Sequence, residues 1–216
     1  MKKLCFIVGA GDMRGTELEI LKDALVIAAD GGLTALNEAG ITPDIIMGDF
    51  DSLGRVPAGD NVLFHDPEKD DTDTMLAVKK ALELGAGTIV IFGGLGGRLD
   101  HSIANLQTLN YIANRGAEGY LIGCGNGCTF LKNGGIAFAA GMEGLLSVFS
   151  LTETSEGVDL LGVKYPLSNH TLTSDFPLGV SNEFTGIPAS VSVKNGTLAV
   201  IWSGSGYHPA DYNRIQ

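Results

Sequence analysis

Short apolar runs alternate with polar, glycine-rich turns along the first 125 residues of the chain. Each run is long enough for one strand, and most of them end in Gly or Asp. The runs occupy residues 4–8, 24–29, 44–47, 62–64, 88–92 and 119–122. Compact apolar runs bounded by turn residues are typical of strands that are buried in a sheet.

Two of the segments between these runs carry apolar residues at helical spacing. In the first segment Met75, Val78 and Leu82 lie three and four residues apart, and residues 71–73 supply the acids and the cap that a helix start favours. In the second segment the same spacing continues over residues 99–113. Strands that alternate with helices predict a mostly parallel sheet with both faces covered.

The pattern changes at about residue 126, where helical spacing fades. Short segments rich in β-branched and aromatic residues follow, at 145–151, 189–193 and 198–202. Lys194-Asn195-Gly196-Thr197 predicts a hairpin turn, and residues 206–216 have the composition of a polar tail.

These patterns together predict two domains. Residues 1–128 form an α/β domain with a mostly parallel sheet, and residues 129–216 form an all-β sandwich. The hydrophobic content of 44% in 216 residues is sufficient for a core in each domain.

Charge and cysteine content exclude several classes of function. The chain has 25 acidic and 14 basic residues, a net charge of −11, which argues against nucleic acid or an anionic membrane as a partner. No apolar stretch is long enough to span a bilayer. The three cysteines, Cys5, Cys124 and Cys128, lack the paired spacing of a zinc site and fit a reducing compartment, so we expect a cytoplasmic protein.

Acidic residues gather between residues 44 and 73. Gly48-Asp49-Phe50-Asp51-Ser52 stands near the start of this run, and Lys69-Asp70-Asp71-Thr72-Asp73 closes it. Two like charges 4 Å apart repel by about 1 kcal/mol in water and about 4 kcal/mol near a protein surface. Converging carboxylates therefore need a cation, and Mg²⁺ is the ion that combines a few carboxylates with phosphate oxygens.

Polar motifs follow four of the predicted strands at the same position, the carboxyl end. Asp30 follows the second strand, Asp49 and Asp51 the third, residues 70–73 the fourth and residues 93–100 the fifth. In an open parallel sheet these ends form the ligand crevice. Any one motif is explained by a turn or a helix cap, but the four together favour a binding site.

Residues 93–101 form the second candidate element, a glycine-rich loop that leads into a helix. Glycines allow backbone N–H groups to approach an anion closely, and Arg98 adds donors suited to phosphate oxygens. The alternative is a plain strand-to-helix turn in which Arg98 pairs with Asp100. The usual nucleotide fingerprints are missing, since Arg14 stands where the dinucleotide motif requires Gly and no P-loop occurs.

The order of these motifs resembles that of the thiamine pyrophosphokinase family. The matching motifs are Ala29-Asp30-Gly31-Gly32, Gly48 to Ser52, Lys69 to Asp73, Gly93 to His101 and Ser181-Asn182-Glu183-Phe184. The resemblance covers nearly the whole chain. It implies an α/β domain with a β-sandwich, a homodimer, and an enzyme that transfers diphosphate from ATP to thiamine and releases AMP.

The resemblance also implies roles for individual residues. The expected Mg²⁺ ligands are Asp49, Asp51, Asp73 and, directly or through water, Asp70. The expected catalytic residues are Asp49, Asp51, Asp73 and Arg98. The expected ATP contacts are Asp30, Gly31, Gly32, Lys69, Gly94, Gly97 and Arg98. The expected thiamine contacts are Asp100, His101, Ser181 and Asn182.

Simpler roles and other functions stay open at this point. Asp100 also fits the first turn of a helix, and Ser181 and Asn182 also fit a turn. The same motifs also suit a Mg²⁺-dependent phosphotransferase with another hydroxylated acceptor, or a non-catalytic nucleotide or thiamine sensor.

Overall fold

The structure, a computed structural model, describes residues 3–51, 54–66, 68, 70–204, 206–209 and 211–215. The chain divides into two compact units, Met1–Gly125 and Asn126–Gln216. The division falls at residue 125 rather than 128, because the strand that begins at Asn126 pairs within the second unit.

The first unit contains a sheet of parallel strands, in the order β6-β5-β1-β2-β3-β4. The strands are β1 (Lys3–Val8), β2 (Leu25–Ala29), β3 (Ile45–Gly48), β4 (Val62–Phe64), β5 (Ala86–Phe92) and β6 (Glu118–Gly123). All six runs predicted from the sequence are strands, and the predicted mostly parallel α/β fold is confirmed.

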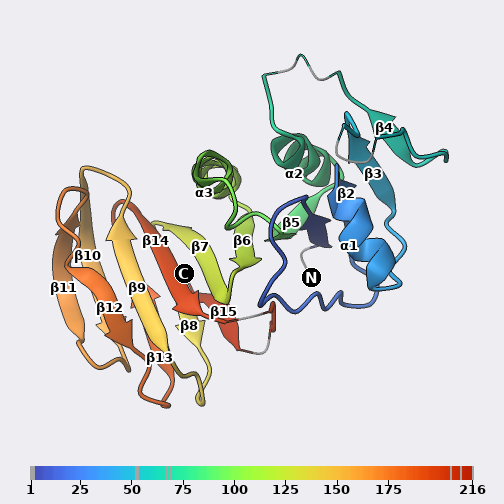
Figure 1. Ribbon diagram of the computed structural model, residues 1–216. Helices are drawn as coiled ribbons and strands as arrows, with labels where there is room; N and C mark the ends of the chain where they lie inside the picture. The colour runs from blue at the N-terminus through green and yellow to red at the C-terminus, as the bar shows by residue number, and fades with distance from the viewer. Residues whose placement is uncertain are drawn as a thin grey trace. The chain divides into compact units, whose positions relative to one another are not determined.

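Three helices connect these strands: α1 (Gly32–Glu38), α2 (Asp73–Glu83) and α3 (Leu99–Ala113). The chain moves outward across the sheet from β2 to β3 but in the reverse direction from β4 to β5 and β6. Right-handed crossovers therefore place α1 on one face of the sheet and α2 and α3 on the other, as Figure 1 shows. The short helix α1 is an element that the apolar spacing did not predict.

The centre of the first unit is fully buried. Phe6 and Ile7 of β1 and Ile89, Val90 and Ile91 of β5 have no exposed surface. Because both faces of these strands are buried, their sequences are continuous apolar runs. The loops at the ends of β1 and β5 therefore start from buried, closely packed strands.

The second unit contains two antiparallel sheets. One has the order β12-β9-β14-β7, and the other has the order β11-β10-β13-β8-β15. The strands are β7 (Asn126–Lys132), β8 (Gly135–Phe138), β9 (Leu145–Ser150), β10 (Thr154–Leu161), β11 (Leu167–Thr173), β12 (Gly179–Glu183), β13 (Ala189–Ser192), β14 (Thr197–Ser203) and β15 (Tyr212–Ile215). Phe138 of one sheet meets Trp202 of the other with ring centroids 5.6 Å apart, so the two sheets share one core.

Two predictions about this unit were wrong. The turn at 194–197 does not make a hairpin, because β13 and β14 pair into different sheets. The segment 206–216 is not a polar tail, since Tyr212–Ile215 forms β15 along β8, and Tyr207 and Tyr212 are buried. Both errors concern pairing with distant residues, which local turn chemistry and polarity do not report.

Candidate active site

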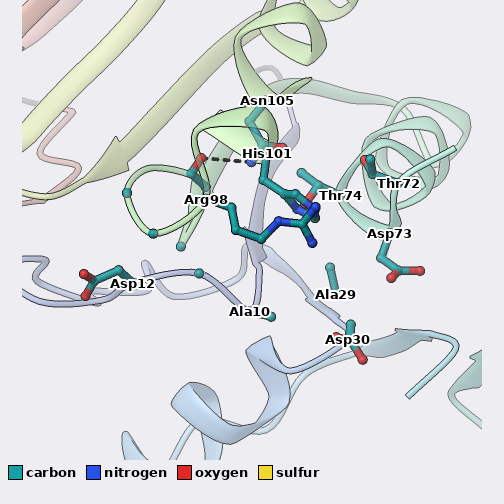
Figure 2. Close-up of a pocket in the computed structure, with 15 residues that line it drawn as sticks. Ala10, Asp12, Ala29, Asp30, Thr72, Asp73, Thr74, Arg98, His101 and Asn105 are labelled. Atoms are coloured by element: carbon teal, nitrogen blue, oxygen red, sulfur yellow. Dashed lines mark hydrogen bonds between the residues drawn. The ribbon is translucent and has the colours of Figure 1, made fainter. Parts of the chain in front are cut away.

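A cavity of about 460 Å³ opens at the carboxyl ends of strands in the first unit (Figure 2). Its described lining consists of Ala10, Gly11, Asp12, Ala29, Asp30, Thr72, Asp73, Thr74, Gly93, Gly94, Gly96, Gly97, Arg98, His101 and Asn105. The loops after β1 and β5 meet here, at the point where the direction of the chain across the sheet reverses. Open α/β sheets bind their ligands at this switch point.

The loops after β1 and β5 touch through their backbones. The N–H of Gly11 donates to the carbonyl oxygen of Gly93 at 3.0 Å. A Cβ added to Gly11 would lie 2.1 Å from that oxygen, so only glycine permits the contact. The glycines therefore serve the packing of two loops as well as any anion.

The loop after β5 leads into α3, which lines the cavity with one face. Arg98 at the N-cap, His101 and Asn105 follow one another at helical spacing, and all three line the cavity. Asn105 was not among the predicted residues. Its spacing of seven from Arg98 was the signal in the sequence that could have revealed it.

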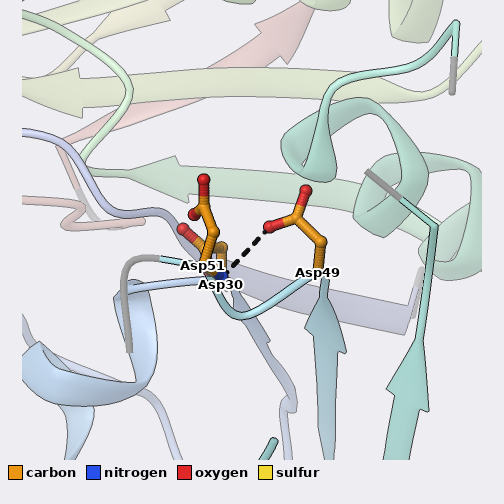
Figure 3. Close-up of side chains that lie close together, drawn as sticks. All are labelled: Asp30, Asp49 and Asp51. Carbon is orange, nitrogen blue, oxygen red and sulfur yellow. Dashed lines mark hydrogen bonds between the residues drawn. The ribbon is translucent and has the colours of Figure 1, made fainter. Parts of the chain in front are cut away.

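Three carboxylates from neighbouring loops converge beside this cavity (Figure 3). Asp30 follows β2, and Asp49 and Asp51 follow β3; one oxygen atom of each lies within 4.8 Å of those of the other two. The backbone N–H of Asp51 donates to Oδ1 of Asp49 at 3.3 Å. Asp30 also lines the cavity, which makes the carboxylate cluster and the cavity continuous.

The backbone around this cluster adopts conformations that are unfavourable for most residues. Asp30 has φ +48° and Phe50 has φ +61°, both in the left-handed region. Phe50 is 2% exposed, so its buried ring anchors the loop between Asp49 and Asp51. Gly48 makes room for Asp30, since a Cβ on Gly48 would lie 3.0 Å from the Asp30 Cα. Such strain concentrates at functional sites.

The carboxylate cluster fits a hard divalent cation. Asp30 is 9% exposed, and its Oδ1 is buried without a hydrogen-bond partner in the part of the chain that the structure describes. A buried carboxylate oxygen of this kind is costly unless a ligand completes it. Oxygen ligands from carboxylates are what Mg²⁺ requires.

The predicted metal ligands are only partly brought together. Asp49 and Asp51 meet Asp30, for which the motifs predict contact with the nucleotide and not with the metal. Asp73 lines the cavity from the first residue of α2. Asp70 is not among the described residues that line the cavity, and Lys69 lies outside the described residues.

Arg98 and Asp100 are paired with each other. Nη2 of Arg98 lies 2.6 Å from Oδ2 of Asp100, and Nε donates to Oδ1 at 3.2 Å. This hydrogen bonding lowers the pKa of Asp100 and raises the pKa of Arg98. Both side chains are well exposed, at 71% and 65%, so either can exchange its partner for a ligand at little cost.

A second ion pair, which no sequence motif predicts, lies in the loop after β1, where Asp12 stands beside Gly96. Arg14 donates from Nε and Nη2 to the carboxylate of Asp12, at 3.0 Å to Oδ1 and 2.5 Å to Oδ2. These hydrogen bonds lower the pKa of Asp12 to about 2. Asp12 therefore lines the cavity as an anion held by Arg14.

Gly31 and Gly32, predicted to contact ATP, stand at the start of α1. Neither is among the described residues that line the cavity. A Cβ on Gly32 would lie 1.9 Å from the carbonyl oxygen of Val8, so Gly32 is required for packing against β1.

Ser181 and Asn182 belong to the second unit. Asn182 is 4% exposed, and its side-chain amide binds the backbone of Tyr165. Its Nδ2 donates to the Tyr165 carbonyl oxygen at 2.8 Å, and its Oδ1 accepts from the Tyr165 N–H at 3.0 Å. Ser181 is exposed with φ +58°, and its N–H donates to Ser147 Oγ at 3.1 Å. The structure thus gives Asn182 a structural role, because it fixes the backbone at Tyr165.

The carboxylate cluster, the glycine loop and the switch-point cavity are the features of an α/β enzyme of the phosphotransferase class. Residues 17–121 match the model of the thiamin pyrophosphokinase catalytic domain, and residues 136–198 match that of the thiamin pyrophosphokinase vitamin B1 binding domain. The chain belongs to the thiamine pyrophosphokinase family, as the resemblance of its motifs had implied.

Individual relatives agree with this assignment. The thiamine pyrophosphokinase of Bacillus subtilis is 32% identical over 186 residues, which cover 83% of this chain and 87% of that protein. A crystal structure of thiamine pyrophosphokinase from Bacillus subtilis matches with a TM-score of 0.85 and 30% identity, over 94% of this chain and 99% of that one. The structure of the Geobacillus thermodenitrificans protein matches with a TM-score of 0.80 and 30% identity, over 93% and 97%.

No helix within the described ranges is both long and apolar enough to cross a bilayer.

Proposed function

We propose that this protein transfers a diphosphate group from ATP to the hydroxyl group of thiamine, giving thiamine diphosphate and AMP. The observation that carries the proposal is the convergence of Asp30, Asp49 and Asp51 beside a glycine-lined cavity, within the residues that match the family's catalytic domain. The named relatives support thiamine as the acceptor.

Mg²⁺ would be held by Asp30, Asp49 and Asp51. Their proximity and the buried, unpartnered Oδ1 of Asp30 support this set. When bound, the ion offsets the repulsion among the carboxylates and neutralises charge on the phosphate oxygens. Asp73 on the cavity wall and Asp70 remain proposed as further ligands, direct or through water.

The glycine loop and Arg98 would hold the phosphate chain. Backbone N–H groups of residues 93–97 stand at the start of α3, where the helix terminus favours anions. Arg98 would leave Asp100 to donate to phosphate oxygens, and Lys69 is proposed as a second cation. The location of Gly94, Gly97 and Arg98 on the cavity wall supports these roles.

The chemical step depends on alignment and charge neutralisation. The hydroxyl oxygen of thiamine forms a bond to the β-phosphorus of ATP while the bond from that phosphorus to the bridging α-phosphate oxygen breaks. AMP carries away the bonding electron pair, and the hydroxyl proton passes to an acceptor such as a site carboxylate. Asp49, Asp51 and Asp73 are the proposed catalytic carboxylates.

Thiamine would be recognised by both units. Asp100, once released by Arg98, offers a carboxylate to an aminopyrimidine edge, and His101 lines the cavity one residue further along α3. In the second unit the proposed contacts are Ser181 and Asn182. The match of residues 136–198 to the vitamin B1 binding domain supports that part of the proposal.

The second unit is also proposed to form a homodimer. Several apolar side chains there are well exposed, among them Tyr165 at 59%, Phe176 at 64% and Val180 at 48%. Grouped exposed apolar residues mark interaction surfaces. Light scattering during gel filtration would give twice the chain mass of 22.5 kDa if the proposal holds.

The decisive experiment is an end-point assay by mass spectrometry with thiamine, ATP and Mg²⁺, with and without EDTA. Thiamine diphosphate and AMP formed together, only with metal, would establish donor, acceptor and transferred group. ADP with thiamine monophosphate would contradict diphosphate transfer. Binding of both substrates without products would favour a sensor, and turnover of another hydroxylated acceptor would replace thiamine.

A further inference from the structure

The cavity wall includes a buried polar residue, Asn105, that belongs to none of the sequence motifs. Asn105 lies on α3, on the same face as Arg98 and His101, and is 6% exposed (Figure 2). A buried polar side chain requires a hydrogen-bonded partner. The partner of Asn105 is the backbone of the glycine loop.

The hydrogen bond joins Nδ2 of Asn105 to the carbonyl oxygen of Gly94 at 2.9 Å. The orientation of the amide follows from chemistry, since only its NH₂ end can donate to a carbonyl. Gly94 itself is buried, and a Cβ there would lie 2.4 Å from Leu121 Cδ1. The Gly94 carbonyl is therefore removed from water and satisfied by Asn105.

Hydrogen bonds hold the glycine loop at Gly93, Gly94 and Leu95, where the Leu95 carbonyl accepts from Cys124 Sγ at 3.6 Å, whereas Gly97 is open. Gly93 is held by the N–H of Gly11, and Gly94 is held by Asn105. Gly96 and Gly97 follow with φ +80° and +64°, and a Cβ on Gly97 would meet no atom within 4 Å. The hydrogen bond from Asn105 therefore holds the middle of this segment, directly before the two glycines with positive φ.

We propose that Asn105 is a positioning residue that holds the glycine loop in the shape in which its backbone and Arg98 meet the phosphate groups of the nucleotide. The inference rests on the proposed nucleotide site. Asn105 acts through Gly94, not through contact with the phosphates. Its loss should weaken binding of the phosphate chain and leave binding of the nucleoside unchanged.

The physical reason is the cost of an unpaired buried carbonyl. Without the Asn105 donor, the Gly94 carbonyl must turn to find water or another donor. That carbonyl lies in the peptide between Gly94 and Leu95, and glycine on its N-terminal side offers little resistance to the rotation. The loop then leaves its phosphate-binding shape, while the sheet and α3 keep their cores.

The test compares neutral variants, so that no new charge reaches the phosphates. Asn105→Leu keeps the branched shape and the number of heavy atoms but removes the donor, and Asn105→Ala provides a second variant if the larger leucine disturbs folding. Asn110→Leu is the matched control, because Asn110 is exposed on the same helix. Calorimetric titration gives the Kd of MgATP and of adenosine for each protein, and circular dichroism checks the fold.

Both Asn105 variants should raise the Kd of MgATP about tenfold, with adenosine within about twofold of wild type and Asn110→Leu unchanged. In turnover, KM for ATP should rise more than KM for thiamine. Equal losses for MgATP and adenosine, or no loss in a folded variant, would overturn the inference. A wild-type protein that binds no MgATP would overturn the proposed function as well, and that failure is visible before any variant is made.

Discussion

Single residues at the cavity are held in conformations that only a function explains. Asp30 combines a left-handed backbone, near-complete burial and a carboxylate oxygen with no partner within the described chain. Each of these features costs stability. All three features occur beside Asp49 and Asp51. We therefore expect a substitution at Asp30 to raise stability while it lowers activity.

Asp30→Asn should lower kcat about 100-fold or more, because it removes one charge from the proposed metal site. Without Mg²⁺ the same change should raise the free energy of unfolding by about 1 kcal/mol, because one repulsive charge is lost. Turnover assays and urea denaturation measure the two effects. Asp23→Asn is the control, since Asp23 is exposed with φ +65°. Full turnover by Asp30→Asn would remove Asp30 from the metal site.

The ion pair between Asp12 and Arg14 should be visible in acid titration. The hydrogen bonds from Arg14 lower the pKa of Asp12 from 3.8 to about 2. Because the folded pKa lies below the unfolded value, the pair contributes stability above about pH 4. That contribution is lost as the pH falls through 2. Carboxyl NMR should find the Asp12 pKa near its ordinary value in Arg14→Leu, and an unchanged pKa would contradict the assigned cause.

At the scale of elements, the site depends on how helix starts and strand ends are packed. The first residue of α1 touches the last residue of β1, because Gly32 lies where any Cβ would strike the Val8 carbonyl. Thr72 caps the start of α2, since its Oγ1 accepts from the Met75 N–H at 3.2 Å. The shape of the cavity therefore depends on contacts at the ends of helices and strands.

Gly32→Ala should destabilise the first unit by about 3 kcal/mol, because overpacking against backbone cannot be relieved by a side-chain rotation. Urea denaturation followed by circular dichroism measures the loss. Gly134→Ala is the matched control, since a Cβ there would make ordinary contacts at 3.6 and 3.7 Å. A fully stable Gly32→Ala protein would leave a direct role toward ATP as the remaining reason for this glycine.

At the scale of the whole molecule, an excess of acid is concentrated where a cation would be bound. The net charge of −11 includes the carboxylate cluster, which lies in the unit that matches the catalytic domain. Ligands that bind only the folded state raise its stability by mass action. Binding of metal and nucleotide should therefore appear as thermal stabilisation.

MgATP at 100 times its Kd should stabilise the protein by about 2.7 kcal/mol, which corresponds to a rise in Tm of about 5 to 10 °C for a domain of this size. A thermal unfolding scan measures the rise. EDTA should abolish most of it, and Asp51→Asn should reduce it. The same rise with ATP and EDTA would contradict a site built on these carboxylates.

The sequence by itself determined the elements of the first unit and the chemistry available to it. Buried parallel strands leave continuous apolar runs, and helices that cover a sheet leave apolar residues at helical spacing. Both signals are local, so all six strands and the two longer helices could be predicted. The rule that parallel strands share their carboxyl ends was enough to bring Asp30, Asp49, Asp73 and Arg98 to one cavity or its edge.

Only the tertiary structure decided which groups meet. Asp30 joins Asp49 and Asp51 because β2 and β3 are neighbours in the sheet, whereas Asp73 approaches from the start of α2. Asp12 and Asn105 line the cavity although neither belongs to a motif in the sequence. In the second unit, turn residues at 194–197 predicted a reversal but not the change of sheet. Sheet order and long-range pairing depend on contacts between residues that are distant in the chain. The local spacing of apolar residues does not predict such contacts.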